Sequence, residues 1–149
     1  MKAKILIVLI GIIIITACNK DKYTDAPQIS LKSVNTTVLY PNNVLTFDIT
    51  VTDKQGDVQD TIWVQKITAN CSLSDFTQSY PVPYFNPTKN FKGVFELSYA
   101  YGIGTNYPPI KEPSCFRQND TCVFKFWMKD LANHQSDTIT TPTIILIHR

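Results

Sequence analysis

The sequence predicts an all-β protein, an antiparallel sandwich of two sheets with about seven strands, preceded by a cleaved signal peptide. Two observations predict this class. Short segments in which apolar and polar residues alternate recur along the chain, and this is the period of a half-buried strand. Turn-forming residues separate these segments at regular intervals, whereas no stretch of ten or more residues has the periodicity of an amphipathic helix.

The alternation is clearest in residues 44–52, where every second residue is a large apolar one and the residues between them are mostly threonine. The other predicted strands are rich in β-branched and aromatic residues, which favour extended structure. They comprise residues 29–34, 61–68, 91–101, 121–129 and 137–148. Asparagine, aspartate and glycine between these strands suit tight reversals, because they tolerate the backbone angles that turns require. The turns are residues 41–43, 53–56 and 130–133.

Two stretches are less regular. Residues 72–89 contain three prolines, which would interrupt the hydrogen bonds of a central strand, so this stretch suits an edge strand followed by a loop. Residues 102–120 form a long excursion that contains further prolines. Long loops in compact domains are often functional.

The chain begins with a short apolar segment behind positive charges. Lys2 and Lys4 precede the unbroken apolar run from Ile5 to Ile15. As a helix this run would reach about 17 Å, whereas the hydrocarbon core of a bilayer is about 30 Å thick. A charged start, a short apolar middle and small residues at the end are typical of a secretory signal peptide.

The exit of this segment, Ile15-Thr16-Ala17-Cys18, resembles the lipobox of bacterial lipoproteins. The resemblance implies that residues 1–17 are removed and that Cys18 carries a lipid anchor. Residues 18–27 then form a tether, and residues 28–149 form one domain. Asn19 after the cysteine favours the outer membrane over retention in the inner membrane. The alternatives are an ordinary cleaved signal peptide, with Cys18 unmodified, or an uncleaved membrane anchor.

The charge of the mature chain limits its partners. Cleavage before Cys18 removes 17 of the 149 residues and leaves 132, the size of one domain. It also removes Lys2 and Lys4, so 12 basic residues remain against 12 acidic ones. A domain without net charge has no electrostatic attraction to nucleic acid, and we expect no nucleic-acid partner.

Three cysteines remain besides Cys18, and an oxidising compartment permits one disulfide among them. Cys115 and Cys122 bracket a short polar loop, so we expect these two to pair. Pairing of Cys71 with either of them, or no disulfide, remains open. The bond would be structural, since no CxxC motif is present.

The predicted strands and turns are similar to those of immunoglobulin-like and fibronectin-III-like domains found in small bacterial lipoproteins. Residues 47–53, Gly56-Asp57 and residues 126–133 carry this resemblance. It implies a β-sandwich over residues 28–149. Domains of this fold serve in adhesion, as spacers or in ligand binding, so the fold does not decide the function.

Acidic residues in two turns suggest a calcium site. Asp53, Asp57 and Asp60 lie in one connection and Asp130 in another, and an immunoglobulin-like topology places both at the same end of the sandwich. Calcium prefers six to eight oxygen ligands, many from carboxylates. The first segment resembles an Asp-x-Asp-Gly-Asp calcium loop, although Gln55 stands where the second acid is expected. The alternative is that Asp53 and Asp130 only stabilise their own turns.

A cluster of aromatic residues suggests a second kind of surface, on which rings stack against a glycan or dock a protein partner. The residues are Tyr80, Tyr84, Phe85, Tyr99, Tyr101 and Tyr107. Alternation favours a core position for Tyr99 and Tyr101.

Catalysis is not expected, because the chain has only two histidines, His134 and His148, and no GxSxG, HExxH or phosphate-binding glycine motif. We therefore expect a non-catalytic envelope lipoprotein, held at the membrane through Cys18, with an adhesion, scaffold or accessory-binding role. The alternative is a surface lipoprotein that is stabilised by calcium or binds carbohydrate.

Overall fold

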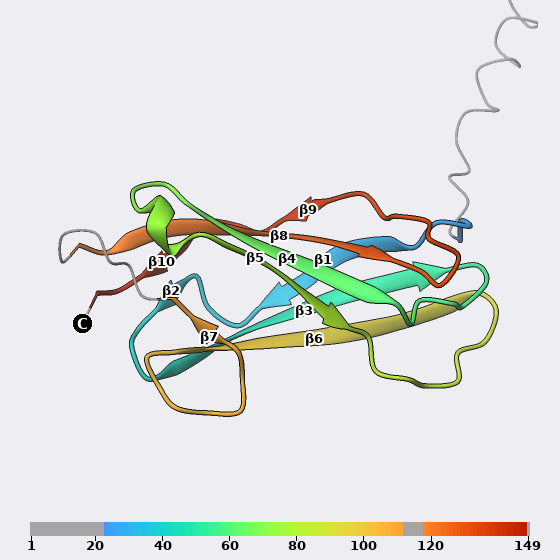
Figure 1. The fold of residues 1–149 in the computed structure, drawn as a ribbon, viewed down its shortest axis with the longest axis horizontal. Helices are drawn as coiled ribbons and strands as arrows, with labels where there is room; N and C mark the ends of the chain where they lie inside the picture. The colour runs from blue at the N-terminus through green and yellow to red at the C-terminus, as the bar shows by residue number, and fades with distance from the viewer. Residues whose placement is uncertain (1–22, 112–117, 149) are drawn as a thin grey trace, which may run out of the picture.

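The computed structural model describes residues 23–111 and 118–148, and the predicted lipidation site Cys18 lies outside these ranges. The described chain is all-β, as predicted, and its two sheets stack face to face (Figure 1). Seven of its strands have three or more residues. One turn of 3₁₀ helix, Ser72–Ser74, is the only helical element in the described ranges. No helix in these ranges has the length and apolar character needed to cross a bilayer.

The first sheet has four strands. In spatial order they are β1 (Gln28–Val34), β3 (Asn43–Asp53), β6 (Phe91–Tyr101) and β7 (Pro109–Ile110). The β3–β6 ladder is antiparallel and runs without a shift from the pair Asn43 and Tyr101 to the pair Asp53 and Phe91. This ladder is the longest one in the sheet. β7 pairs with β6 only at Ala100 and Tyr101.

The second sheet has six strands, of which β9 (Ile139–Thr140) pairs only with β8. The others are, in spatial order, β2 (Val38–Leu39), β10 (Ile144–Leu146), β8 (Asp120–Lys129), β4 (Thr61–Thr68) and β5 (Phe76–Pro81). Most pairs are antiparallel as predicted, but the pairs β2–β10 and β6–β7 are parallel. Neither pair is joined by a tight hairpin, which would impose antiparallel pairing: β2 and β10 are far apart in the sequence, and residues 102–108 separate β6 from β7.

The core lies between the sheets and follows the alternation of the sequence. The inward side chains of β3 are fully buried, and they are Leu45, Phe47, Ile49 and Val51. Those of β8 are buried opposite them, and they are Cys122, Phe124, Phe126 and Met128. Phe47 joins the two sheets, because its ring centroid lies 4.9 Å from that of Phe124 and 5.1 Å from that of Phe126.

The two irregular stretches also agree with the prediction from the sequence. β5 is an edge strand of the second sheet, and Pro81 is its last residue, which agrees with the prediction for residues 72–89. The excursion from residue 102 contributes only the short strand β7 among its described residues.

One buried polar cluster interrupts the apolar core. The side chains of Lys66 and Asp120 are 0% and 1% exposed, and the Lys66 Nζ lies 3.8 Å from the Asp120 Oδ2. The Lys66 ammonium also donates to the Ser74 Oγ at 2.8 Å and to the Ser74 backbone oxygen at 3.1 Å. The Ser74 hydroxyl donates in turn to Asp120. Burial lowers the pKa of Lys66, while nearby negative charges, that of Asp120 among them, oppose this shift.

The predicted disulfide between Cys115 and Cys122 is wrong, because Cys122 is a free thiol. Its side chain points into the core from β8 and is 2% exposed. Burial raises the pKa of the Cys122 thiol to about 12. Cys71 is disulfide-bonded, and Cys115 lies outside the described residues. The alternative in which no disulfide forms is therefore also wrong, and a pairing of Cys71, which the sequence left open, is the one that forms.

Candidate metal centre

The first part of the site is the connection between β3 and β4. Asp53 ends β3 on its inward face and is fully buried. Its Oδ1 accepts a hydrogen bond from the backbone N–H of Gly56. Gly56 has φ of +80°, and a Cβ at this position would lie 2.4 Å from the backbone oxygen of Thr88. Glycine is therefore required here, and the tight turn that it permits brings Asp57 back towards Asp53.

The second part is the turn that follows β8. Asp130 is fully buried, and its Oδ1 accepts a hydrogen bond of 2.7 Å from the backbone N–H of His134. The Asp130 Oδ2 lies 2.9 Å from the His134 Nδ1. Asn133, with φ of 68°, takes the left-handed conformation that closes this turn. The turn therefore fixes the Asp130 carboxylate through two contacts with the same histidine.

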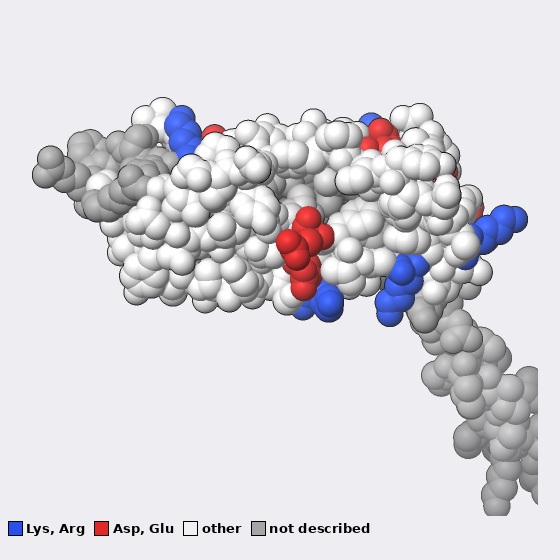
Figure 2. All heavy atoms as spheres, turned by 90° about the horizontal axis from the view of Figure 1, so that it is seen from below, with Lys and Arg blue, Asp and Glu red and all other residues white. Residues whose placement is uncertain are grey.

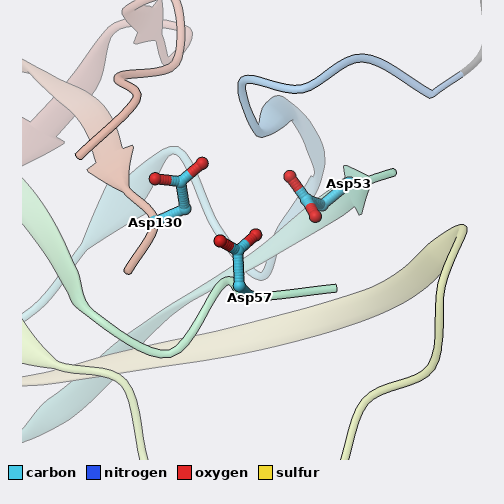
Figure 3. Close-up of side chains that lie close together, drawn as sticks. All are labelled: Asp53, Asp57 and Asp130. Atoms are coloured by element: carbon cyan, nitrogen blue, oxygen red, sulfur yellow. The ribbon is translucent and has the colours of Figure 1, made fainter. Parts of the chain in front are cut away.

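One backbone hydrogen bond joins the two connections, because the N–H of Leu131 donates to the oxygen of Asp57 at 2.9 Å. As a result, Asp53, Asp57 and Asp130 come together, with one carboxylate oxygen from each within 4.8 Å of the others. Figure 3 shows the three carboxylates directed towards a common space between the connections. The sequence predicted that these two turns lie at the same end of the sandwich, and the structure places them there.

The electrostatics of this cluster are unfavourable without a cation. The Asp53 Oδ2 and the Asp57 Oδ1 are buried and have no hydrogen-bond partner among the described residues. Burial raises the pKa of Asp53, and the charges of Asp57 and Asp130 raise it further, against the hydrogen bond from Gly56. The cation in direct contact with the cluster is His134 when it is protonated, and its pKa is raised by its hydrogen bond to Asp130 and by the charge of that carboxylate. A buried carboxylate oxygen without a partner is costly, and a bound cation would remove this cost.

The donor set fits calcium. Ca²⁺ binds carboxylate oxygens at about 2.3–2.6 Å, so two ligands on opposite sides of one ion lie about 5 Å apart. The limit of 4.8 Å between the three oxygens allows all of them to contact one ion. The three residues supply one carboxylate oxygen each, and water would have to complete the coordination.

Asp60 was predicted as a fourth ligand but is not part of the cluster. Its Oδ1 accepts a hydrogen bond from the Thr61 hydroxyl, and its backbone oxygen accepts one from the N–H of Val82. Both contacts belong to the start of β4 and its neighbour β5, so Asp60 stabilises the sheet instead. The turn-stabilising contacts of Asp53 and Asp130, the alternative interpretation of these residues, are present together with the cluster.

The segment before β1 contacts the same end of the sandwich. The Lys54 Nζ lies 3.3 Å from the Asp25 Oδ1, and the Gln55 amide donates to the same oxygen at 2.9 Å. The backbone N–H of Lys54 donates to the oxygen of Thr24 at 3.1 Å. The turn that holds Asp53 is therefore bonded to the chain just before the first strand.

A second candidate site is a mostly apolar groove of about 450 Å³ between β5 and β6. Four of the six aromatic residues singled out from the sequence line it, namely Tyr80, Tyr84, Phe85 and Tyr99. Tyr101 is fully buried, and its hydroxyl donates to the Ile147 backbone oxygen at 2.8 Å. Tyr107 is 48% exposed and does not line the groove.

No protein-family model matches the chain, and no curated protein matches it. Among solved structures, it is similar to the crystal structure of Spo0M, a sporulation control protein from Bacillus subtilis, with a TM-score of 0.46 and 10% sequence identity. The match covers 85% of this chain and 51% of the Spo0M chain, so the chain spans about half the length of that protein.

Proposed function

We propose that this chain is a non-catalytic, lipid-anchored protein of the bacterial envelope whose β-sandwich binds one calcium ion between Asp53, Asp57 and Asp130. The observation that carries the proposal is the pair of buried carboxylate oxygens, on Asp53 and Asp57, that have no hydrogen-bond partner among the described residues and lie beside a third carboxylate. The bound ion would fix the connection after β3 to the turn after β8. The sandwich would then be a rigid scaffold for binding partners outside the cytosol.

The expected affinity suits this location. Calcium sites in extracellular modules have dissociation constants of about 10⁻⁴–10⁻³ M. A site of this class is filled where calcium is millimolar and is empty in the cytosol. Export would therefore switch the domain into its calcium-bound, more stable form.

Calcium is expected to raise the melting temperature of the full chain in detergent. At a free calcium concentration about 100 times the dissociation constant, binding stabilises the folded state by about 2.7 kcal/mol, which is about 10 °C for a domain of this size. The measurement is thermal unfolding by circular dichroism, after removal of metal with a chelator and again with added CaCl₂.

Asp57→Asn provides the decisive variant and Asp60→Asn its matched control. Asp57→Asn is expected to abolish the calcium response and to raise the stability of the metal-free protein, because it relieves repulsion with Asp53 and Asp130. Asp60→Asn, a neutralisation in the same connection but outside the cluster, is expected to keep the response. A wild-type melting temperature that does not change up to about 100 mM calcium, about 100 times the weakest dissociation constant expected, contradicts the calcium site.

The lipid anchor rests on the short apolar segment and on the lipobox-like residues Ile15 to Cys18. A lipid with two or more acyl chains holds a protein at a membrane stably, since each buried methylene contributes about 0.8 kcal/mol. The domain would then stand above the membrane on the residues between Cys18 and β1.

Cells that are fed an alkyne fatty acid are expected to label the wild-type chain, which should fractionate with membranes. Cys18→Ser is expected to lose the label and to leave the membrane fraction. Cys122→Ala serves as the control, because it removes a different cysteine and should keep both properties. Label that persists in Cys18→Ser would contradict the anchor but would leave the calcium site untouched.

A further inference from the structure

The outer edge of β6 is largely unpaired. β6 lies between β3 and β7, and β7 covers only Ala100 and Tyr101. Within the described ranges, no other strand pairs with this edge. The segment from Lys92 to Ser98 therefore forms an open strand edge, which lies along the lower side of the molecule in Figure 1.

The hydrogen bonds on either side of the sheet show which backbone groups face this edge. The N–H of Ala100 donates to the oxygen of Pro108, on the β7 side. Thr46 exchanges hydrogen bonds with Asn35 on the β1 side, and its partner in the β3–β6 ladder is Ser98. Since alternate residues of a strand point their N–H and C=O groups to the same side, four more residues face the open edge. They are Lys92, Val94, Glu96 and Ser98.

The apolar groove runs beside this edge. Consecutive residues from Phe95 to Tyr99 form one wall of it, and Tyr80 to Phe85, at the end of β5, form the other. Phe95 and Leu97 belong to the inward face of the first sheet, yet both remain partly exposed. The sandwich is therefore open along this seam, and its core residues form the floor of the groove.

The outer face of the same strand is acidic at its centre. Glu96 pairs directly with Asp48 across the β3–β6 ladder, and like charges in this position repel each other. Asp48 has a distant cation, because the Lys32 Nζ lies 4.0 Å from it, whereas Glu96 has no ion pair among the described residues. Figure 2, which shows the molecule from below, has an acidic patch next to a hollow, with a basic side chain at the lower edge of the patch.

We propose that the open edge of β6 and the adjoining groove bind an extended peptide segment of a partner protein by strand addition. The peptide's backbone pairs with the groups of Val94, Glu96 and Ser98. Its alternate apolar side chains enter the groove, and a lysine or arginine between them lies beside Glu96. Backbone pairing supplies affinity and the groove supplies selectivity, as in other strand-addition complexes.

Two features favour a peptide over a glycan. The chain already adds a strand at this edge, since β7 pairs with Ala100 and Tyr101, just beyond the open segment. The open segment also lacks two of the devices that protect an edge, because it contains no proline and its pairing with β3 has no bulge. Lys92 lies at only one end of the segment.

The inference does not depend on the calcium site.

The test uses the full chain in detergent and an acetylated octapeptide of alternating valine and lysine. Binding is measured by isothermal titration, and hydrogen exchange measures the protection of single backbone amides. We expect the peptide to bind and to slow exchange at the amides of Val94, Glu96 and Ser98. A peptide methylated on alternate backbone nitrogens, which cannot donate along one edge, is expected to bind more weakly.

Val94→Pro and Val94→Thr form a matched pair. The N–H of Val94 faces the open edge and not β3, so proline is compatible with the sheet and removes only the outward donor. It is expected to weaken peptide binding at least about tenfold, the effect of one or two lost hydrogen bonds. Val94→Thr is expected to bind as the wild type does. Glu96→Lys is expected to weaken binding of the lysine peptide and to favour a peptide of alternating valine and glutamate.

Three results would overturn the proposal. Equal affinity of the Val94→Pro and Val94→Thr variants would show that the backbone edge is not used. Binding of an envelope polysaccharide in the groove, without binding of the peptide, would assign the site to a glycan. Concentration-dependent dimerisation that Val94→Pro abolishes would assign the edge to a second copy of this chain.

Discussion

Asp120→Asn is expected to lower the free energy of unfolding by about 3–5 kcal/mol, as is usual when one partner of a buried ion pair is removed. Asp120 and Lys66 are both buried, and Lys66 reaches Asp120 directly and through Ser74. Without the carboxylate, the ammonium of Lys66 has only neutral partners in the cluster with Ser74. The measurement is urea unfolding of both proteins at pH 7, followed by circular dichroism.

The loss of stability in Asp120→Asn is expected to depend on pH. The pKa of Lys66 in the folded protein is below its ordinary value of 10.5, so between these two values the unfolded chain binds more protons, and stability rises with pH. Loss of Asp120 lowers the pKa of Lys66 in the folded protein further, so the pH range in which stability rises becomes wider. The deficit of Asp120→Asn should therefore shrink as the pH approaches 10.

A double variant separates the missing charge from a general effect of substitution. Lys66→Met with Asp120→Leu replaces the whole pair with apolar groups, and it is expected to cost much less than Asp120→Asn alone. A loss below about 1 kcal/mol for Asp120→Asn, or a larger loss for the double variant, would show that the pair does not act in this way.

Phe47→Ala is expected to lower the free energy of unfolding by about 3–5 kcal/mol. Phe47 is fully buried, and its ring contacts aromatic residues of both sheets, Tyr99 on β6 and Phe124 and Phe126 on β8. Truncation removes these contacts and leaves a cavity at the junction of the sheets. Urea unfolding measures the loss.

Thr50→Ala is the matched control for this substitution, since Thr50 lies on the outward face of the same strand. It is expected to change stability by no more than about 0.5 kcal/mol. Phe47→Leu, which keeps most of the volume, is expected to fall between the two variants. If Phe47→Ala cost as little as Thr50→Ala, the sheets would not depend on this aromatic junction.

Most of the fold could be predicted because strand alternation is a local property of the sequence. Residues 44–52 alternate so regularly that their buried face follows directly. The parallel pairings of β2 and β7 could not be predicted, since strands of two residues have no period. Lys66 occupies an inward position of β4 in the sequence pattern, but its partner Asp120 is more than fifty residues away, and only the folded chain brings them together.

The candidate site was partly predictable for the same reason. Asp53, Asp57 and Asp130 follow strands whose ends the sequence locates, so their meeting at one end of the sandwich could be expected. Asp60 could not be separated from them without the backbone bond to Val82. The sequence did contain a signal against the predicted Cys115–Cys122 disulfide. Alternation in β8 places Cys122 on the same face as Phe124 and so in the core. The groove depends on the spacing of two sheet edges, which local sequence does not encode.

The contacts of Thr24 and Asp25 with Lys54 and Gln55 have a mechanical consequence. Tension on the chain ahead of β1 reaches the Asp53–Gly56 turn before it reaches the β1–β3 ladder. A divalent ion that bridges this turn to Asp130 would pass the load on to β8, in the middle of the other sheet. With the proposed anchor and ion in place, the acidic end of the sandwich is the point at which drag on the domain would be shared between both layers.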